Sequence, residues 1–169
     1  MNSPHMLLIG GRSGVGKSTV AFALHDLLSA SGVQHAVVEG DALDLAYPAP
    51  WEQHMAERNL RAIWNNYAAD GYRRLIYTNT VSVLEADKLA RALGDDAEVT
   101  SVLLQASDKT AEQRLGRREQ GDSLSEHVAR SVQADRFLDA RAPSSVHRIT
   151  TDTLDPGDIA EEIIQILRW

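Results

Sequence analysis

The sequence predicts an α/β fold in which a five-stranded parallel sheet lies between two layers of helices. Short apolar stretches alternate with longer amphipathic stretches five times along the 169 residues, which is the pattern of repeated strand-helix-strand units with right-handed crossovers. No internal repeat, low-complexity tract or linker interrupts this alternation. A glycine-rich segment at residues 11–18, with the sequence GRSGVGKS, separates the first strand from the first helix.

The first half of the chain predicts two strands and two helices. The first strand is expected at residues 6–9, an apolar run that ends at the glycines, and the first helix at residues 18–31, where apolar residues recur at helical spacing. The second strand, at residues 35–41, ends in a carboxylate. Two prolines prevent regular structure in the loop at residues 42–51, and a helix with one apolar face follows at residues 52–69.

The second half continues the alternation of strands and helices. Residues 74–78 form the third strand and residues 99–104 are apolar enough for a central strand, with a helix expected between them at residues 84–93. Residues 108–140 are expected to be largely helical, with an interruption at residues 121–123. The last strand and the last helix are expected at residues 147–150 and 156–167.

The composition is that of an ordinary globular protein of one domain, residues 1–169, with 43% hydrophobic residues. The net charge of −7 argues against nonspecific binding to nucleic acid, and the lack of cysteine excludes thiolate metal sites. Without a long apolar run or a signal peptide, the protein is expected in the cytoplasm and not at a membrane. Residues 1–5 are interpreted as vector-derived. The oligomeric state, monomer or homodimer, stays open.

The segment at residues 11–18 fits the pattern G-x-x-x-x-G-K-[ST], the phosphate-binding loop or P-loop. Its glycines permit backbone turns that point successive N–H groups at phosphate oxygens. Lys17 is expected to reach the β- and γ-phosphates of a nucleotide, and Ser18 is expected to offer its hydroxyl group to Mg²⁺. The predicted nucleotide-binding residues of this segment are Gly11, Ser13, Gly14, Val15, Gly16, Lys17, Ser18 and Thr19.

Asp41 is the most informative carboxylate of the sequence. Ligands of parallel sheets bind outside the carboxyl ends of the strands, and the residues expected at this edge are Gly11, Asp41, Asn79, Gln105 and Thr151. Two catalytic roles fit Asp41: it holds a Mg²⁺-bound water, or it accepts the proton of an acceptor hydroxyl group that attacks the γ-phosphate. The alternative is an ordinary turn aspartate after Gly40.

A cluster of arginines is predicted on one side of a helix, because Arg114, Arg117 and Arg118 are spaced at i, i+3 and i+4. Such a cluster suits a mobile lid at about residues 108–125 that closes over a triphosphate, with Arg114 and Arg118 as the stronger catalytic candidates. The alternative is a solvated helix face whose arginines pair with Glu112 and Glu119.

The acceptor side is expected at the loop that follows Asp41 and at the start of the next helix. Tyr47 and Trp51 are candidates for an apolar wall around an organic substrate, with Arg58 or Asn79 as polar contacts. Core packing is an equally good interpretation for the aromatic residues, Trp64 included. The histidines show no metal-ligand spacing, so no site is assigned to them.

These residues resemble the P-loop small-molecule kinases related to adenylylsulfate kinase, gluconate kinase, chloramphenicol phosphotransferase and the tunicamycin-resistance proteins. The resemblance rests on residues 11–19, on Glu39-Gly40-Asp41, on residues 114–118 and on residues 151–153. It implies a nucleoside-kinase-like P-loop fold with a helical lid. It also implies acceptor contact or base catalysis by Asp41, phosphate contact by Arg114 and Arg118, and adenine packing near Thr151 and Thr153.

Two departures from adenylylsulfate kinases concern the acceptor side and the lid. Residues 58–61, RNLR, are similar to the Asn-Ile-Arg-Arg stretch of those enzymes, but Met55-Ala56 replaces the Asp-Arg pair that precedes it there. The Lys-Gly-Leu-Tyr segment of their lid is absent as well. Sulfate activation is therefore not the expected reaction.

The sequence thus predicts an ATP- and Mg²⁺-dependent kinase that phosphorylates a hydroxyl group of a nucleoside, sugar or antibiotic. It lacks the Asn-Lys-x-Asp motif of GTPases and the acidic pair of ATPase motors. Two alternatives stay open. A nucleotide kinase needs arginines on the acceptor side, where Arg58 and Arg61 are the candidates, and a regulatory protein binds ATP without turnover.

Overall fold

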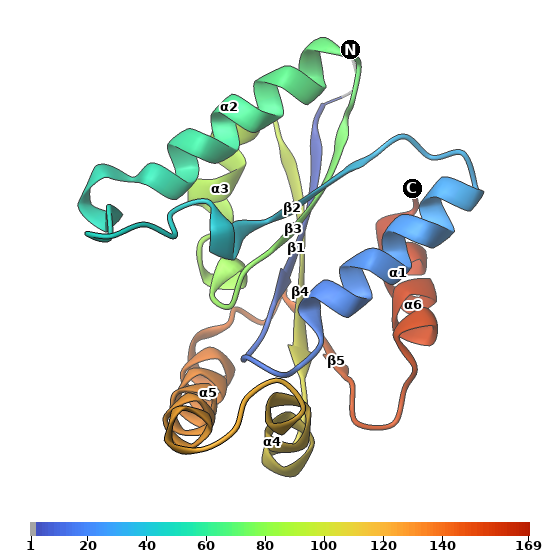
Figure 1. Cartoon of the computed structure of the whole chain (residues 1–169). Coiled ribbons are helices and arrows are strands. Elements are labelled where there is room, and N and C mark those ends of the chain that lie inside the picture. Colours follow the sequence, from blue (N-terminus) through green and yellow to red (C-terminus); the bar gives the residue numbers. More distant parts are fainter. Residues whose placement is uncertain (1–2) are drawn as a thin grey trace.

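The computed structural model describes residues 3–169 and confirms a three-layer α/β fold (Figure 1). Five parallel strands form one sheet in the order β2-β3-β1-β4-β5. The strands are β1 (His5–Gly10), β2 (Ala36–Glu39), β3 (Arg74–Thr78), β4 (Glu98–Gln105) and β5 (His147–Thr150). Because β1 is the central strand, the P-loop that follows it leaves from the middle of the carboxyl edge of the sheet.

Six α-helices accompany the sheet within the described part of the chain. They are α1 (Lys17–Ala30), α2 (Met55–Ala69), α3 (Ala86–Leu93), α4 (Asp108–Gly116), α5 (Asp122–Arg141) and α6 (Pro156–Leu167). α1 and α6 cover one face of the sheet, and α2 and α3 cover the other. α4 and α5 lie together at the carboxyl ends of the strands, beside the P-loop (Figure 1).

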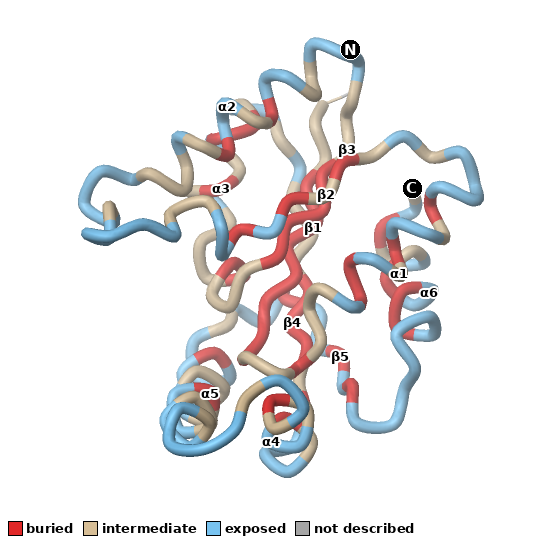
Figure 2. Tube along the Cα trace, viewed as in Figure 1, coloured by how far each residue is buried: buried red, intermediate tan, exposed pale blue. Residues whose placement is uncertain are grey.

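Apolar side chains of the strands form two cores, one on each face of the sheet. Leu7 and Ile9 of β1 belong to the core under α1 and α6, whereas Met6 and Leu8 belong to the core under α2 and α3. All four side chains are completely buried, and each contributes about 1.5–3 kcal/mol to folding. Burial on both faces is why the first strand is a continuous apolar run rather than an alternating one. Figure 2 shows the buried residues concentrated along the sheet.

Every predicted strand and helix is present, although several boundaries differ by one to three residues, and two of these differences have a clear cause. β2 ends at Glu39, two residues earlier than predicted, because Gly40–Ala42 form a 3-10 turn. α2 begins at Met55 rather than at residue 52, since Trp51–Gln53 form a separate 3-10 turn. His54 between them has a φ of 50°, a left-handed conformation that interrupts a right-handed helix.

The predicted interruption between residues 108 and 140 is also confirmed. α4 ends at Gly116, and α5 begins at Asp122 after Gly121, whose φ is 78°. This left-handed conformation is the one that glycine adopts at little cost. The chain therefore turns back at Gly121, which places α5 alongside α4.

The first residues of the chain contribute to the sheet. His5, which the sequence analysis assigns to a vector-derived segment, belongs to β1, and its Nε2 lies 3.2 Å from Oγ1 of Thr100. The Pro4 carbonyl oxygen accepts a hydrogen bond from the Glu98 backbone N–H at 2.8 Å. Met1 and Asn2, the first two residues of that segment, lie outside the described residues.

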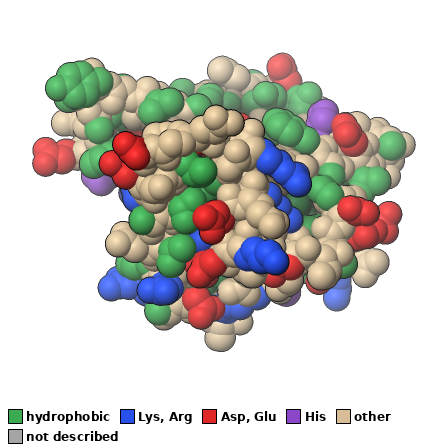
Figure 3. Space-filling model, turned by 60° about the horizontal axis from the view of Figure 1, so that its bottom comes forward, with side chains coloured by type: hydrophobic (Ala, Val, Ile, Leu, Met, Phe, Trp, Pro, Cys, Tyr) green, Lys and Arg blue, Asp and Glu red, His purple; other side chains and the backbone are tan. Residues whose placement is uncertain are grey.

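The surface carries mixed charges on the side of α4 and α5. Basic and acidic side chains are interspersed over that face (Figure 3). Among the helices that the structure describes, none is both long and apolar enough to cross a membrane.

Candidate active site

The P-loop forms the floor of the candidate active site, between β1 and α1. Gly14 and Gly16 have φ values of 84° and 105°, which side chains other than glycine adopt only with strain. Gly14 is constrained a second time, because a Cβ atom there would lie 2.8 Å from the carbonyl oxygen of Ala111. α1 begins at Lys17 without a side-chain cap, so its first N–H groups are available to an anion.

Lys17 lies folded back over the P-loop. Its Nζ donates hydrogen bonds to the carbonyl oxygens of Gly11, at 2.8 Å, and Arg12, at 3.3 Å. Burial lowers the pKa of Lys17, the carboxylate of Asp41 opposes this change, and Arg118 adds to it. The ammonium group is therefore poorly hydrated, which strengthens its attraction to a phosphate.

A cavity of about 170 Å³ lies over the P-loop, and we call it the phosphate cavity. Its walls come from segments that are far apart in the sequence. They include Lys17 and Ser18 of the P-loop region, Asp41 after β2, and Arg118 after α4. The structure thus brings together four residues that the sequence analysis assigns to catalysis or to metal binding.

Gly40 lets Asp41 reach this cavity. A Cβ atom on Gly40 would lie 2.3 Å from the ring of Tyr77, so only glycine lets the end of β2 come this close to β3. Asp41 Oδ1 then accepts a hydrogen bond of 2.8 Å from Asn79 Nδ2, which orients the carboxylate. Although the side chain is exposed, the protein atoms around the carboxyl group raise its pKa, and nearby Lys17 opposes this shift.

Arg114 differs from the free lid arginine that the sequence suggests. Its Nη1 donates hydrogen bonds to the carbonyl oxygen of Val15 and to Oγ1 of Thr151, both at 2.9 Å, and its Nη2 donates to the carbonyl oxygen of Thr151 at 2.9 Å. Thr151 is 2% exposed, and its hydroxyl group also donates to Val15, at 3.1 Å. Arg114 therefore ties α4 and the loop after β5 to the P-loop.

A second cavity, of about 250 Å³, lies on the α6 side of the P-loop, and we call it the nucleotide cavity. Arg114, Arg117 and Arg118 all line it, although only Arg114 lies on α4 and the other two follow its end. The P-loop and α1 contribute Gly14, Val15, Gly16 and Thr19, and the loop before α6 contributes Thr151 and Leu154. Thr153 is exposed and does not line this cavity.

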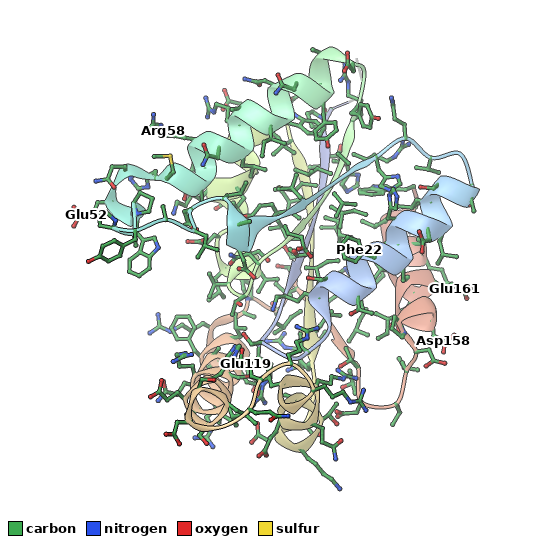
Figure 4. The ribbon with its side chains drawn as sticks, in the orientation of Figure 1. Phe22, Glu52, Arg58, Glu119, Asp158 and Glu161 are labelled. Atoms are coloured by element: carbon green, nitrogen blue, oxygen red, sulfur yellow. The ribbon has the colours of Figure 1, made fainter. Side chains whose placement is uncertain are left out.

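A third cavity, of about 240 Å³, lies between α2, α3 and the end of β3, and we call it the acceptor cavity. Trp51 and Asn79 line it, as predicted for substrate residues. Tyr47 is completely exposed and lines none of the three cavities. Arg58 projects from the outer side of α2 (Figure 4), and Trp64 is a core residue with 2% exposure.

Two further groups at the phosphate cavity were not found by sequence reasoning. Glu119 and His127 line this cavity and form a hydrogen bond, with Oε1 2.8 Å from Nδ1. Glu119 lies where the α4–α5 connection approaches the P-loop (Figure 4). No motif links the two residues, since they meet only because α5 folds back on α4.

Arg12 is the other residue that the sequence does not reveal. It occupies a variable position of the P-loop pattern, yet its side chain is 1% exposed. Its Nε donates to Oγ of Ser131 at 2.9 Å, and its Nη1 lies 2.5 Å from Oδ1 of Asp108 and 3.9 Å from Oδ2 of Asp135. Arg12 thus joins the P-loop to both α4 and α5.

Three solved structures share this architecture over nearly the whole chain. The tunicamycin resistance protein of Deinococcus radiodurans is 23% identical, with a TM-score of 0.67 and coverage of 98% of this chain and 95% of that chain. The APS kinase of Mycobacterium tuberculosis, in complex with AMPPNP and APS, is 23% identical (TM-score 0.63, coverage 100% of both chains). A gluconokinase of Sinorhizobium meliloti is 21% identical (TM-score 0.62, coverage 99% and 94%).

These likenesses establish the fold, and a family profile establishes the relationship. No curated protein sequence matches the chain significantly. The profile described as adenylylsulphate kinase, however, matches residues 3–117, which contain the P-loop, Asp41, Asn79 and Arg114. The chain therefore belongs to the adenylylsulphate kinase family and is an ATP-dependent P-loop kinase of small molecules.

Proposed function

We propose that this kinase transfers the γ-phosphoryl group of ATP, with Mg²⁺, to a hydroxyl group of a small organic molecule, and that Asp41 is the catalytic base. The observation that carries the proposal is the phosphate cavity, in which Asp41 lies opposite Lys17 and Ser18. The hydrogen bond from Asn79 orients the carboxylate, and Asn79 also lines the acceptor cavity. One carboxylate can therefore meet both the phosphate to be transferred and the hydroxyl group that receives it.

The transfer follows from these positions. The acceptor hydroxyl group gives its proton to Asp41, its oxygen forms a bond to the γ-phosphorus, and the bond from that phosphorus to the β–γ bridging oxygen breaks to release ADP. The Lys17 ammonium and the Arg118 guanidinium groups stabilise the negative charge on the transferring oxygens. Partial burial suits the base role, because the raised pKa makes the Asp41 carboxylate a stronger proton acceptor.

The residues at this site also fit a magnesium ion. Mg²⁺ prefers oxygen ligands and keeps several waters, so one or two protein oxygens beside the nucleotide phosphates suffice. Ser18 would hold the ion through its hydroxyl group, and the Asp41 carboxylate would contact it directly or through a water. When bound, the ion would supply positive charge that offsets the negative charge of the phosphates. Other parts of the proposal are ATP packing beside Thr151 and a cytoplasmic location, where ATP is available.

A nucleotide kinase fits the structure less well. Its acceptor is a phosphate group, which needs basic side chains in the acceptor cavity. Arg58 projects away from that cavity (Figure 4), and Nη2 of Arg61 donates to the carbonyl oxygen of Arg91 at 2.8 Å on the exposed surface. Neither arginine lines the acceptor cavity. The family's sulfate-activating reaction meets the same objection, since APS is an anionic acceptor.

The experiment that tests the proposal measures transfer from γ-labelled ATP with Mg²⁺ to nucleosides, nucleoside monophosphates, sugars and hydroxylated antibiotics, with water as the background acceptor. Transfer to a compound with a free hydroxyl group, lost in Asp41→Asn, is the expected result. Transfer to a nucleoside monophosphate would establish the nucleotide-kinase alternative. ATP binding without transfer to any member of the panel would favour a regulatory protein.

A further inference from the structure

The acceptor cavity is negatively charged, although it adjoins a site that binds the most anionic substrate of the reaction. Its lining includes the carboxylates of Asp44, Glu57 and Glu85 and, among the described residues, a single basic group, Lys88. Three carboxylates against one ammonium group leave a formal charge of −2.

Lys88 is already engaged by the carboxylates beside it. Its Nζ forms a close ion pair with Oε1 of Glu57 and lies 3.5 Å from Oε1 of Glu85. The hydrogen bond to Glu57 raises the pKa of Lys88. Burial by itself raises the pKa of Glu57, but its hydrogen bond with Lys88, a backbone hydrogen bond and the nearby positive charge together lower it. Both groups therefore stay charged near neutral pH, and Lys88 is not free to bind an anionic acceptor.

The acceptor cavity also offers aromatic groups that lack partners of their own. Trp51 lines it while 73% of its surface is exposed, so its indole ring is accessible to a ligand. Tyr77 lines the cavity and is 2% exposed, yet its hydroxyl group makes no hydrogen bond within the described residues. The hydroxyl oxygen is not a buried atom without a partner, so it reaches the cavity, where it is available to a ligand.

Carboxylates beside an exposed indole form a recognition site for a cation. An ammonium group over the face of tryptophan is attracted by the ring quadrupole, and tryptophan is the strongest of the aromatic side chains in this respect. The carboxylates add a direct charge attraction. A phosphate, sulfate or carboxylate of an acceptor would instead be repelled by Asp44 and Glu85.

We propose that the acceptor carries a positively charged nitrogen in addition to the hydroxyl group that is phosphorylated, and that this nitrogen binds between Trp51 and the carboxylates of Asp44 and Glu85. This inference rests on the proposed function. The substrate class is accordingly a hydroxylated amine, such as an amino sugar, an amino alcohol or an amine-bearing antibiotic. Asn79 and Tyr77 then contact the hydroxyl end, near the base Asp41.

The test compares compounds that share a scaffold and differ in charge. The probes are glucosamine, glucose and glucuronate, then choline and its neutral isostere 3,3-dimethylbutanol, and kanamycin as a larger hydroxylated amine. Binding to the protein with AMPPNP and Mg²⁺ is measured by calorimetry, and transfer from ATP is measured separately. At least one cationic probe is expected to bind about tenfold more tightly than its neutral counterpart, less so at high salt.

Single substitutions identify the side chains that bind the cationic probe. Asp44→Asn and Glu85→Gln are each expected to weaken binding of the cationic probe about fivefold, with no change for the neutral probe. Trp51→Leu is expected to weaken it by a similar factor. Glu52→Gln is the matched control, because Glu52 belongs to the same loop but projects away from the cavity (Figure 4), and it is expected to change nothing.

Several results would overturn the inference. They are tighter binding of glucuronate than of glucosamine, no preference of any cationic probe over its neutral isostere, or no saturable binding of any cation at millimolar concentrations. An equal loss of affinity in Glu52→Gln would show a general charge effect rather than binding at a specific site. Failure of the proposed function is distinguishable: cation binding that persists without any transfer from ATP would contradict the kinase reaction and leave the cation site standing.

Discussion

The proposed nucleotide side and the proposed acceptor side of the candidate active site are built in different ways. On the nucleotide side, Arg12 and Arg114 are tied by hydrogen bonds to the P-loop, to α4, to α5 and to the loop after β5. On the acceptor side, Leu45, Tyr47 and Trp51 are 85%, 100% and 73% exposed. One half is held in place before any ligand arrives, and the other presents apolar groups to water.

This difference follows from what each half must recognise. The phosphates of ATP are the same in every kinase, so a preformed set of N–H groups and basic side chains serves them without adjustment. The acceptor differs between kinases, and loops tolerate the sequence changes that a new acceptor requires. Substitutions on the nucleotide side should therefore change the rate of phosphoryl transfer and the stability of the fold. Substitutions on the acceptor side should change the selectivity among acceptors.

The largest effect is expected for Lys17→Ala on the nucleotide side. Transfer should fall about 10³-fold, because charge stabilisation in the transition state is lost. The fold should be kept, since among the described residues Lys17 bonds only to backbone carbonyl oxygens of its own loop. Transfer from γ-labelled ATP and the circular dichroism spectrum measure both properties. Lys109→Ala, at an exposed lysine of α4, is the control. Unchanged transfer in Lys17→Ala would refute the P-loop assignment.

The next effect is expected where the two halves meet. Asp41→Asn should lower transfer at least about 10²-fold, the usual contribution of a general base, with little change in ATP affinity. The folded state should not be weakened, because burial disfavours the charged form of Asp41 and an asparagine still accepts the bond from Asn79. Initial rates, ATP titration and thermal melting are the measurements. A large loss of ATP affinity would assign Asp41 to the metal site instead.

Arg12→Ala should destabilise the nucleotide side by about 2–3 kcal/mol, because it removes a buried side chain together with its hydrogen bond to Ser131 and its ion pair with Asp108. Urea unfolding measures this free energy. The matched control is Arg136→Ala, since Arg136 is an exposed arginine of α5 and should change stability by less than about 0.5 kcal/mol. Equal stability of the two variants would mean that the P-loop does not depend on α4 and α5.

The pH dependence of transfer reports the state of Asp41. A base must be ionised, so kcat/KM should have its full value above the pKa of Asp41 and should decrease as the pH falls through that pKa. Because burial raises that pKa, the acidic limb should lie at a higher pH than for an ordinary aspartate. The pH profile is measured for the wild type and for Asn79→Ala. In this variant the carboxylate of Asp41 loses its hydrogen-bond donor, so the acidic limb should move to a still higher pH. A limb at or below the ordinary value would contradict the base role.

The smallest effect is expected on the acceptor side at Tyr47. The sequence suggests a substrate contact, but the side chain is completely exposed and lines no described cavity of the site. Tyr47→Ala should change neither the melting temperature nor KM for the acceptor by a measurable amount. A clear rise in KM would show that the loop closes over the acceptor and brings Tyr47 into contact with it.

Short sequence patterns were sufficient to predict most of the fold. The apolar run at residues 6–9 and the glycines after it predict strand, loop and helix without reference to the rest of the chain, since P-loop chemistry depends on adjacent residues. The carboxyl-edge rule then placed Asp41 and Asn79 near the P-loop. The boundary at residue 52 was wrong, because propensity does not reveal the left-handed conformation of His54.

Tertiary structure alone decided the contacts between distant residues. Arg12 and Ser131 are 119 positions apart, and Arg114 and Thr151 are 37 apart. No local pattern encodes such pairs, because the packing of α4 and α5 against the P-loop creates them. The negative charge of the acceptor cavity has the same origin, since Asp44, Glu57 and Glu85 lie on three segments. The sequence by itself determined that the chain binds ATP phosphates, because the P-loop consists of adjacent residues. The arrangement of separate segments decided which side chains surround those phosphates and the acceptor.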